Sequence, residues 1–503
     1  MRLARLLAAA GLEDGGAGEA EVTGFAIDHR KVAPGTVFGA FQGASVNGED
    51  FIADAVQAGA VAVVARPEAH VAGALHIADH TPRRAFAQLA AQFFTPVPPT
   101  LVAVTGTNGK TSTVEMTRQI WRMAGERAAS IGTLGVTTPD ESVSTGLTTP
   151  DIVTFLGNLS GLAREGVTHV AFEASSHGLT QYRNEGVRPQ AVAFTNLSRD
   201  HLDYHADMED YFAAKMRLFD EVAADGGTAV VWIGPKTNDE PDDWSGRAVE
   251  HARRRGLTVV TVGEGGESIR LAAREATQLG QALTIEHAGE TRKLSLPLIG
   301  AYQAANALVA AGLALATGIP AAQVWDALGR LQPVRGRLER AAISRAGAPV
   351  YVDYAHTPDA IEAAIAALRP HVRVRLITVL GAGGDRDHGK RAPMGRAAAE
   401  GSSLVIVTDD NPRGEDAARI RAEVLEGARE IAGEDAREIG DRREAICAAI
   451  AEAGDGDIVL IAGKGHEQGQ IVGSGTEMRI LPFDDVTVAR ECAGGQGSNG
   501  GAA

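Results

Sequence analysis

The hydrophobic pattern of the chain consists of short, almost wholly apolar runs separated by longer stretches with helical spacing. The apolar runs are rich in valine, isoleucine and leucine, and such runs predict strands that are buried on both faces. They lie at 36–41, 60–65, 101–106, 168–174, 190–196, 227–233, 350–355, 376–382, 404–410 and 457–463. Because strands and helices alternate, we expect an α/β fold built on parallel sheets.

The same pattern predicts three units. Residues 1–97 form a small α/β domain that ends in a Pro-rich linker, and residues 98–334 form a second domain that begins with a strand, a loop and a helix. Residues 335–503 alternate again and predict a third domain. Its glycine-rich tail, about 493–503, is predicted to be disordered.

Composition narrows the class of protein. The chain has 503 residues, 44% of them apolar, which is enough for about three domains with substantial cores. Its 64 acidic and 48 basic residues give a net charge of −16, which disfavours non-specific binding to nucleic acid or anionic membranes. No apolar run reaches the roughly 18 residues that cross a membrane. The apolar start predicts a helix ending at Gly11 and no signal peptide, because Glu13 and Asp14 follow it.

The two cysteines, Cys447 and Cys492, are too few for a disulfide framework. Cys447 lies in an apolar helical pattern, where we expect an inert thiol in the core. We therefore predict a protein of the reducing cytoplasm that does not insert into membranes.

The segment 105–112, TGTNGKTS, has the composition of a phosphate-binding loop between a strand and a helix. Its glycines let backbone N–H groups approach phosphates, the helix N-terminus attracts anions, and Lys110 adds a positive charge. Thr111 is then a natural Mg²⁺ ligand. The loop is one residue tighter than the general P-loop, and the alternative is a plain glycine-rich turn. The residues assigned to phosphate binding are Gly106, Thr107, Asn108, Gly109, Lys110, Thr111 and Ser112.

Two further candidates follow neighbouring strands of the second unit. Glu173 lies near the end of one predicted strand and His201 just past the next, so both should reach the crevice beside the phosphate loop. A carboxylate and a neutral imidazole there could hold Mg²⁺. Each also has an ordinary explanation, because Glu173 could pair with a surface lysine and the histidine could be a polar loop residue. Lys215, on an amphipathic helix, would ordinarily be a solvated lysine.

All four apolar strands of the third unit run into polar loops, and ligands of open parallel sheets bind outside such strand ends. Arg386 and Arg413 can each bind a carboxylate through two hydrogen bonds, while Asp410, Asn411 and Glu467 can accept hydrogen bonds from an ammonium group. These loops predict a pocket for an amino acid with several charges. The alternative is a set of surface turns with a structural ion pair.

The segments TGTNGKTS, EASSHGL, NLSRDHLDYH and AAKMRLF, in this order, resemble the central domain of the Mur ligases, a family that is also similar to folylpolyglutamate synthases. The resemblance spans about residues 20–488. It implies a small N-terminal domain for a uridine-nucleotide substrate, a central P-loop ATPase-like domain and a C-terminal Rossmann-like domain that binds an amino acid. The implied activity is ATP-dependent amide-bond formation in peptidoglycan precursor synthesis, through an acyl phosphate.

The resemblance also implies roles at the central site. Lys215 matches a lysine that is carbamylated in the family, which would let it join Glu173 and His201 at a second Mg²⁺ while Thr111 serves the first. Catalysis would thus rest on Lys110, Glu173, His201 and Lys215, with ATP as co-substrate. Asn306, Asp353 and Arg337 look like further nucleotide-binding positions, the last near a domain junction.

The two ends of the chain indicate the substrates. The segment DNPR, 410–413, resembles the signature of the diaminopimelate-adding branch, in which Arg413 would meet the distal carboxylate that lysine lacks. The implied amino-acid contacts are Arg386, Asp410, Asn411, Pro412, Arg413, Gly463 and Glu467. The implied contacts to the uridine-nucleotide substrate are Asp28, His29, Arg30, Ala44, Ser45, Val46, Thr148, Thr149, Ser175, Gln181 and Arg183, and His29 departs from the serine that is common there.

The implied partners are UDP-N-acetylmuramoyl-L-alanyl-D-glutamate, meso-diaminopimelate and ATP, bound by a monomer with a hinge near Arg335–Arg337. Within the family, the lysine-adding and dipeptide-adding ligases predict a residue other than arginine at 413, and a folylpolyglutamate synthase would lack the first domain. A non-catalytic nucleotide-binding regulator remains the alternative of another class, but it would need neither Lys215 nor the charged third-domain pocket. The general base for the attacking amine is not identified by the sequence.

Overall fold

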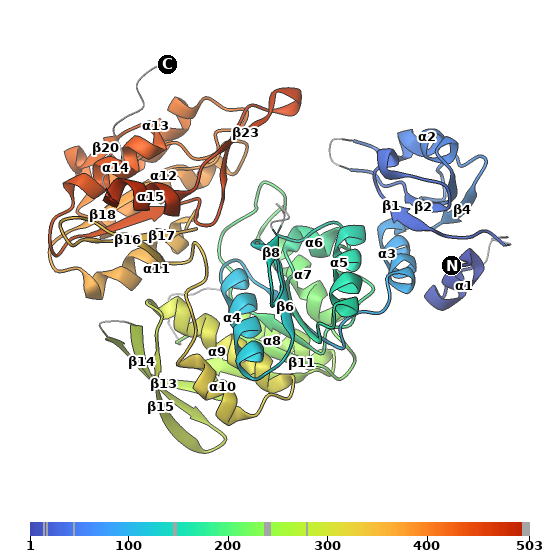
Figure 1. Ribbon diagram of the computed structural model, residues 1–503, viewed down its shortest axis with the longest axis horizontal. Coiled ribbons are helices and arrows are strands. Elements are labelled where there is room, and N and C mark those ends of the chain that lie inside the picture. The colour runs from blue at the N-terminus through green and yellow to red at the C-terminus, as the bar shows by residue number, and fades with distance from the viewer. Residues whose placement is uncertain are drawn as a thin grey trace.

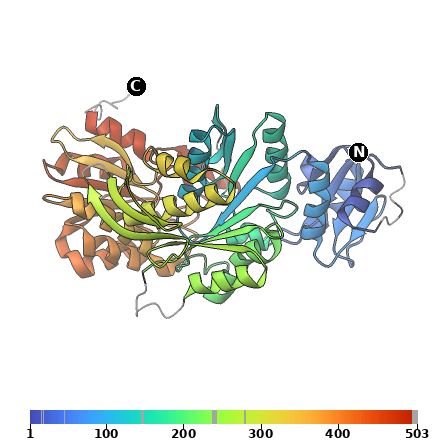
Figure 2. The same ribbon diagram turned by 90° about the horizontal axis from the view of Figure 1, so that it is seen from below.

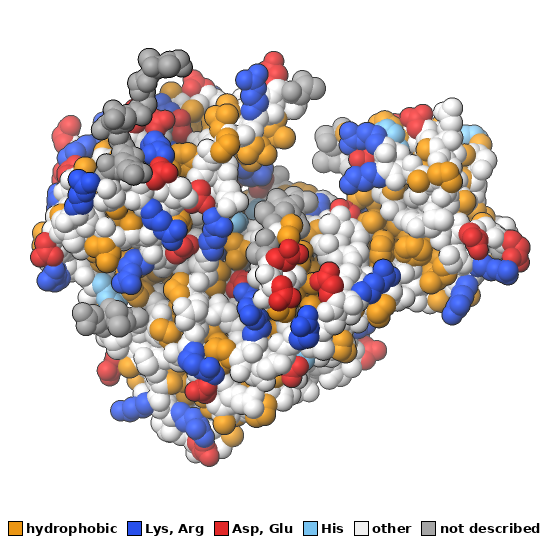
Figure 3. Space-filling model, viewed as in Figure 1, with side chains coloured by type: hydrophobic (Ala, Val, Ile, Leu, Met, Phe, Trp, Pro, Cys, Tyr) orange, Lys and Arg blue, Asp and Glu red, His pale blue; other side chains and the backbone are white. Residues whose placement is uncertain are grey.

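Three α/β units lie in a row in the computed structural model, with the central unit in the middle (Figures 1 and 2). The structure describes residues 1–13, 16, 19–43, 46–143, 148–235, 243–277 and 280–494. Each unit has its own predominantly parallel sheet, so the predicted fold class is confirmed. In the space-filling view the surface is hollowed between the N-terminal and C-terminal units, above the central one (Figure 3).

The N-terminal unit is a four-stranded parallel sheet in the order β1-β2-β3-β4. Its helix α1 ends at Gly11, whose φ of 69° is the left-handed conformation that commonly ends helices. The elements are α1 (Leu3–Ala10), β1 (Gly24–Ala26), β2 (Thr36–Gly39), α2 (Ile52–Gln57), β3 (Ala60–Ala65), β4 (Leu75–Ala78) and α3 (Pro82–Phe93).

The central unit has an eleven-stranded sheet in the order β15-β14-β13-β12-β11-β10-β5-β9-β6-β7-β8. Strand β5 lies between β9 and β10 and is parallel to both, so its side chains are buried on both faces and its sequence is a continuous apolar run. The strands are β5 (Thr100–Thr105), β6 (Ala128–Gly132), β7 (Gly135–Thr137), β8 (Ser142–Val143), β9 (His169–Glu173), β10 (Ala191–Phe194), β11 (Thr228–Trp232), β12 (Thr258–Gly263), β13 (Ile269–Thr277), β14 (Gly280–His287) and β15 (Glu290–Leu296). The helices are α4 (Lys110–Met123), α5 (Ile152–Arg164), α6 (Ser176–Thr180), α7 (Met208–Arg217), α8 (Trp244–Arg254), α9 (Ala301–Ala316) and α10 (Ala321–Leu328).

The C-terminal unit has a six-stranded sheet in the order β16-β17-β21-β18-β19-β20, in which only β16 is antiparallel to its neighbour. Because β17, β21, β18 and β19 are parallel, the loops that follow them meet at one edge, as predicted. The elements are β16 (Glu339–Ile343), β17 (Pro349–Asp353), α11 (Pro358–Leu368), β18 (Leu376–Leu380), α12 (Arg391–Gly401), β19 (Leu404–Val407), α13 (Ala417–Ala432), β20 (Ala436–Glu438), α14 (Arg442–Glu452), β21 (Ile458–Ala462), the hairpin β22 (Gly469–Val472) and β23 (Arg479–Pro482), and α15 (Asp485–Gly494).

The expectation of an inert thiol at Cys447 was wrong. Helix α15 packs on α14 and brings the Cα atoms of Cys447 and Cys492 to 5.1 Å, where the two side chains form a disulfide. The two residues are 45 positions apart in sequence, so the helical pattern around Cys447 carried no sign of its partner. A disulfide closing a loop of this length typically stabilises a fold by about 2–4 kcal/mol.

Two other predictions concern residues that the structure does not describe. These are the tail from 495 onward and the nucleotide contacts Ala44 and Ser45. Within the described ranges, no helix has both the length and the apolar character needed to cross a bilayer.

Candidate active site

The predicted phosphate loop connects β5 to α4 and has space only for glycine at two positions. Gly106 has a φ of 146° and Gly109 a φ of 86°. A Cβ atom would come within 1.9 Å of the Thr195 hydroxyl oxygen at Gly106, and within 2.3 Å of the Asn306 side-chain oxygen at Gly109. The end of β10 and helix α9 therefore hold the loop tightly on two sides, which leaves its backbone N–H groups at the start of a helix, where anions bind.

Two lysines converge on one backbone oxygen of this loop. The Lys110 ammonium donates to the carbonyl oxygens of Gly106 at 2.9 Å and Thr107 at 2.7 Å. The Lys215 ammonium, from α7, donates to the same Gly106 oxygen at 2.7 Å, and its side chain is 1% exposed. Burial and then the charge of Lys110 lower the pKa of Lys215 well below 10.5. The ordinary explanation of Lys215 as a solvated surface lysine is therefore excluded.

Glu173 is buried at the end of β9. Its carboxylate accepts hydrogen bonds from the Thr133 backbone N–H at 2.7 Å and from the Thr133 hydroxyl at 3.1 Å, rather than pairing with a surface lysine. The negative charge of Glu173 acts on Lys110, so the carboxylate faces the phosphate loop. The hydrogen bonds fix its orientation in a buried position, as a metal-binding carboxylate requires.

His201 lies in the loop between β10 and α7. Its Nε2 atom is 3.5 Å from a carboxylate oxygen of Asp200, and burial lowers the pKa of the His201 imidazole to about 3 against the opposing effect of Asp200. The ring is therefore neutral, which is the form that binds metals. Asp200, which the sequence-based prediction missed, also lies 4.0 Å from Lys390 of the C-terminal unit.

The donor groups around the loop fit Mg²⁺ only if Lys215 is modified. An ammonium group repels a cation, and within the described residues no group of three or more His, Cys, Asp or Glu side chains could hold a metal by itself. A carbamate on Lys215 would supply the missing anionic oxygen beside the Glu173 carboxylate and the His201 imidazole.

The five residues of the central unit that were predicted to contact the uridine-nucleotide substrate form one connected cluster. The Thr149 hydroxyl lies 2.9 Å from the Ser175 hydroxyl and donates to the Glu173 carbonyl oxygen at 3.2 Å. The Arg183 guanidinium donates to the Thr149 carbonyl oxygen at 2.9 Å and to the Gln181 side chain at 2.7 Å. The Thr133 hydroxyl, which donates to Glu173, lies 3.1 Å from the Thr148 hydroxyl. The cluster therefore adjoins the phosphate loop.

The predicted nucleotide contacts of the N-terminal unit line a pocket of about 460 Å³. Asp28, His29, Arg30 and Val46 all border it. The Arg30 guanidinium is bound to the Asp28 carboxylate at 2.8 Å, so its charge is already balanced. The His29 ring stacks on Phe51 with ring centres 4.3 Å apart. The histidine that replaces the usual serine of the family therefore has a packing role.

The sequence-based prediction missed Arg83, on α3, in the wall of this pocket. Its guanidinium donates to the Gln42 carbonyl oxygen at 3.1 Å and lies 4.8 Å from the centre of the Phe41 ring, with no carboxylate partner among the described residues. Burial, followed by the nearby charge of Arg183, lowers the pKa of Arg83. The charges of an arginine from the N-terminal unit and one from the central unit thus act on each other, which suits a bound anion.

The acceptor side of the predicted amino-acid pocket contains a buried lysine. The Lys464 side chain is 0% exposed, and its ammonium lies 3.0 Å from the Asn411 side-chain oxygen, 3.2 Å from a Glu467 oxygen and 3.4 Å from an Asp410 oxygen. Gly463 has a φ of 115°, and a Cβ atom there would lie 2.5 Å from the Asp410 carboxylate. The predicted acceptors are thus gathered around an internal cation that the prediction did not include.

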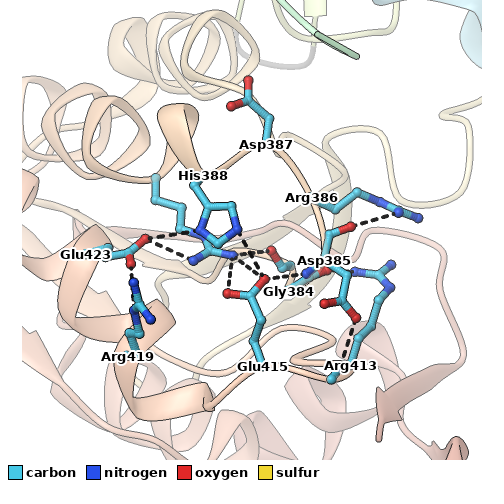
Figure 4. A network of polar contacts seen from close by, with 12 residues as sticks. Gly384, Asp385, Arg386, Asp387, His388, Arg413, Glu415, Arg419 and Glu423 are labelled. Atoms are coloured by element: carbon cyan, nitrogen blue, oxygen red, sulfur yellow. Dashed lines mark hydrogen bonds and ion pairs between the residues drawn. The ribbon is translucent and has the colours of Figure 1, made fainter. Parts of the chain in front are cut away.

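The donor side of the pocket holds two arginines whose charges are not balanced. The Arg413 guanidinium donates to the Gly384 carbonyl oxygen at 2.9 Å and the Arg386 guanidinium to the Asp385 carbonyl oxygen at 3.1 Å (Figure 4). Neither forms an ion pair with a carboxylate in the part of the chain that the structure describes. Pro412 is buried against Gly384, where a Cβ atom would come within 1.9 Å of the Pro412 carbonyl oxygen.

The remaining nucleotide candidates lie where the C-terminal unit meets the phosphate loop. The Arg337 guanidinium donates to the Thr111 hydroxyl at 3.2 Å and stacks over the Tyr354 ring at 4.3 Å. The hydroxyl of Tyr302, another residue that the prediction missed, donates to the buried Asp353 carboxylate at 3.2 Å from α9. Asn306 is on the same helix, so the structure brings all three predicted residues to the junction.

Profiles of three Mur ligase domains match the chain in order. The profile described as Mur ligase family, catalytic domain, matches residues 21–94, the Mur ligase middle domain matches 104–314, and the Mur ligase, glutamate ligase domain, matches 336–465. A protein of Zymomonas mobilis named UDP-N-acetylmuramoyl-L-alanyl-D-glutamate–2,6-diaminopimelate ligase is 60% identical over 470 residues, covering 93% of this chain and 94% of that protein. A protein of the same name from Bradyrhizobium diazoefficiens is 51% identical over 469 residues, covering 92% and 93%. A solved structure of a ligase of that name matches with a TM-score of 0.66 at 32% identity, covering 94% of this chain and 95% of its own.

Three α/β units, with a phosphate loop in the middle one and a charged pocket across the junction, define an ATP-dependent amide-bond ligase. The chain belongs to the Mur ligase family, so the resemblance predicted from its sequence motifs is confirmed.

Proposed function

We propose that this ligase adds meso-diaminopimelate to the D-glutamyl side-chain carboxylate of UDP-N-acetylmuramoyl-L-alanyl-D-glutamate, in the cytoplasm, as a step of peptidoglycan precursor synthesis. The observation that carries the proposal is the pair Arg386 and Arg413. Arg386 is exposed and Arg413 half-buried, and neither has a carboxylate partner among the described residues, although the chain has a net charge of −16. Such a pair suits a substrate with two carboxylates. The names of the relatives support the same substrate.

Amide formation from a carboxylate and an amine is unfavourable in water, so ATP would first phosphorylate the carboxylate to an acyl phosphate. Lys110, at the start of α4, would neutralise the phosphates, while Arg183 and Thr149 would hold the acceptor beside the loop. The amine of the amino acid would then attack the acyl phosphate and release phosphate. Since these anions repel one another, catalysis depends mostly on positive charges that are held in place before the reaction.

Thr111 would hold one Mg²⁺, while Glu173, His201 and a carbamate on Lys215 would hold a second; when bound, the ions neutralise phosphate charge. The carbamate forms when the neutral Lys215 amine attacks carbon dioxide and loses a proton. The ammonium groups of Lys110 and Lys215 both bind the Gly106 carbonyl oxygen, so they lie close together and repel each other. This closeness supports the modification, because a carbamate would replace the positive charge of Lys215 with a negative one. Glu173 stays oriented by Thr133 in either state.

The most direct test measures phosphate release by the purified protein with ATP, Mg²⁺ and UDP-N-acetylmuramoyl-L-alanyl-D-glutamate, with either meso-diaminopimelate or L-lysine added. We expect release with meso-diaminopimelate and at least about a hundredfold lower kcat/KM with lysine, because lysine leaves an arginine of the pocket unpaired. Preference for lysine would contradict the proposed substrate. No release with either amino acid would favour a non-catalytic nucleotide-binding protein.

Replacing Arg83 by alanine should raise KM for the uridine-nucleotide substrate about tenfold or more and leave kcat and KM for ATP nearly unchanged. The reason is that Arg83 offers an unbalanced charge in the nucleotide pocket, and a charge-assisted hydrogen bond contributes about 1.5–3 kcal/mol. Steady-state kinetics with each substrate varied in turn would measure this. Arg5→Ala, at an exposed position of α1, is the control. An unchanged KM in Arg83→Ala would place the nucleotide elsewhere.

We also propose three domains, 1–97, 98–334 and 335–503, with a hinge near Arg335–Arg337. Gly336 there has a φ of 65° and packs against the backbone of His466, so rotation has to remake contacts between this segment and the C-terminal unit. ATP and the amino acid bind to different units, and we expect a smaller radius of gyration in small-angle scattering when all ligands are present. Identical scattering curves with and without ligands would exclude this closure.

A further inference from the structure

The carboxylate of Glu415 is one of the groups that join the loops carrying Arg386 and Arg413 (Figure 4). A backbone hydrogen bond from the Gly384 N–H to the Asn411 carbonyl oxygen, at 3.1 Å, also joins them. Glu415 accepts a hydrogen bond from the backbone N–H of Asp385, the residue before Arg386. In return, the Asp385 carboxylate accepts from the backbone N–H of Gly414 at 3.0 Å, the residue after Arg413. The two loops are thus bound reciprocally, next to both arginines that we assign to the substrate carboxylates.

Glu415 is itself fixed by a buried cation. The Arg391 guanidinium donates to its two oxygens at 2.8 and 3.0 Å, and the Arg391 side chain is 1% exposed. Arg391 also donates to Glu423 on α13 at 2.9 Å and to the Gly383 carbonyl oxygen at 3.4 Å. The charges of the two glutamates outweigh burial and raise the pKa of Arg391, so the guanidinium stays charged.

The backbone of these loops needs such support. Asp385, Asn411 and Arg413 have φ values of 52°, 42° and 51°, a conformation that residues other than glycine rarely adopt. Each such residue costs on the order of 1 kcal/mol, so the loops keep this shape only where other contacts hold it. The hairpin supports Arg413, whose backbone N–H donates to the Ile471 carbonyl oxygen at 3.0 Å. Glu415 and Arg391 support the other loop.

We propose that Glu415 is a positioning residue for the amino-acid substrate, which it does not touch. By holding the Asp385 backbone against the loop of Arg413, it sets the separation of the Arg386 and Arg413 guanidinium groups so that both can meet carboxylates of one molecule. This inference rests on the proposed function. A displacement of about 1 Å at a binding group can cost a factor of about 100, so a loosened loop should weaken this substrate selectively.

The experiment compares two glutamates that bind the same arginine. Glu415→Gln keeps the size of the side chain but loses the charge that holds Arg391 and the Asp385 N–H. Glu423→Gln removes a charge from the same guanidinium, and the Glu423 carboxylate accepts no hydrogen bond from the backbone of either substrate loop. Both glutamates lie near His388, Glu423 at 4.0 Å and Glu415 at 3.7 Å, so this contact is common to the two variants. We expect Glu415→Gln to raise KM for meso-diaminopimelate about twentyfold or more, with kcat and the KM values for ATP and the uridine nucleotide within about threefold of wild type. Glu423→Gln should stay within about threefold in all four parameters.

Equal kinetics of the two variants would overturn the inference, as would a parallel change of all KM values in Glu415→Gln. If Glu415→Gln does not fold, Arg391→Lys serves in its place, because lysine keeps the charge but loses the fork that binds both glutamates, and the same selective rise in KM is expected. Wild-type enzyme that releases no phosphate with meso-diaminopimelate contradicts the proposed function. An active wild type with an unaffected Glu415→Gln contradicts only the role of Glu415.

Discussion

Replacement of Lys215 by alanine is expected to lower kcat at least about a thousandfold. Lys215 is the buried side chain that shares the Gly106 carbonyl oxygen with Lys110, and as a carbamate it would hold the metal ion beside Glu173. Removing one electrostatic group at a reaction centre typically costs a factor of about 100–1000, and the metal would be lost as well. Steady-state phosphate release measures the effect, with Lys293→Ala on the exposed face of β15 as the control.

A second readout separates the carbamate from simple loss of a lysine. Acetate or another small carboxylic acid should partly restore turnover in Lys215→Ala, because it supplies an anionic oxygen in the space that the side chain leaves. In the wild type, ¹³C-labelled carbon dioxide should give a carbamate resonance that Lys215→Ala lacks. Full activity of the alanine variant would contradict the metal-binding role.

Replacement of Arg413 by methionine is expected to lower kcat/KM for meso-diaminopimelate by about two orders of magnitude. The loss of one partner from a buried, hydrogen-bonded charge pair costs about 2–5 kcal/mol, and each 1.4 kcal/mol corresponds to about a factor of ten. Methionine keeps the length and apolar stem of arginine. The KM for ATP should change little, because Arg413 lies in the C-terminal unit, away from the phosphate loop.

The control for this variant is Arg419→Met. Arg419 is an exposed arginine nearby that binds Glu423 at 3.4 Å and is not one of the residues predicted to bind the amino acid (Figure 4). Both variants should be assayed with meso-diaminopimelate and with L-lysine. If Arg413→Met loses activity with the two amino acids in equal proportion, Arg413 does not distinguish them by their distal carboxylate.

The fold was predictable where local pattern and tertiary environment agree. The apolar runs of β5 and β9 are continuous because each strand has parallel neighbours and helices on both faces. The glycines of the phosphate loop were predictable for a similar reason, because Gly106 and Gly109 lie where the loop has no space for a Cβ atom. The hairpin of β22 and β23 escaped prediction because its strands are short and lack alternation of apolar and polar residues; β22 is mostly half-buried and β23 is exposed.

The candidate site was predictable as a set of motifs but not as a set of contacts. The pattern around Lys215 indicates an amphipathic helix, whereas its burial results from the approach of the distant phosphate loop. Lys464 and Arg83 lie beside predicted residues but carry no spacing that marks them as functional. Cys447 and Cys492 show the same limit, since helical periodicity reveals which face of α14 is buried and not which helix covers it.

The contact between Arg337 and Thr111 couples the phosphate loop to the C-terminal unit. Two positive charges at one hydroxyl oxygen repel each other, so a divalent ion arriving with the nucleotide at Thr111 would displace the guanidinium of Arg337. Because Arg337 also stacks on Tyr354, that displacement would change a contact within the C-terminal unit. Binding of the nucleotide would thereby change the orientation of the unit that we propose to bind the amino acid.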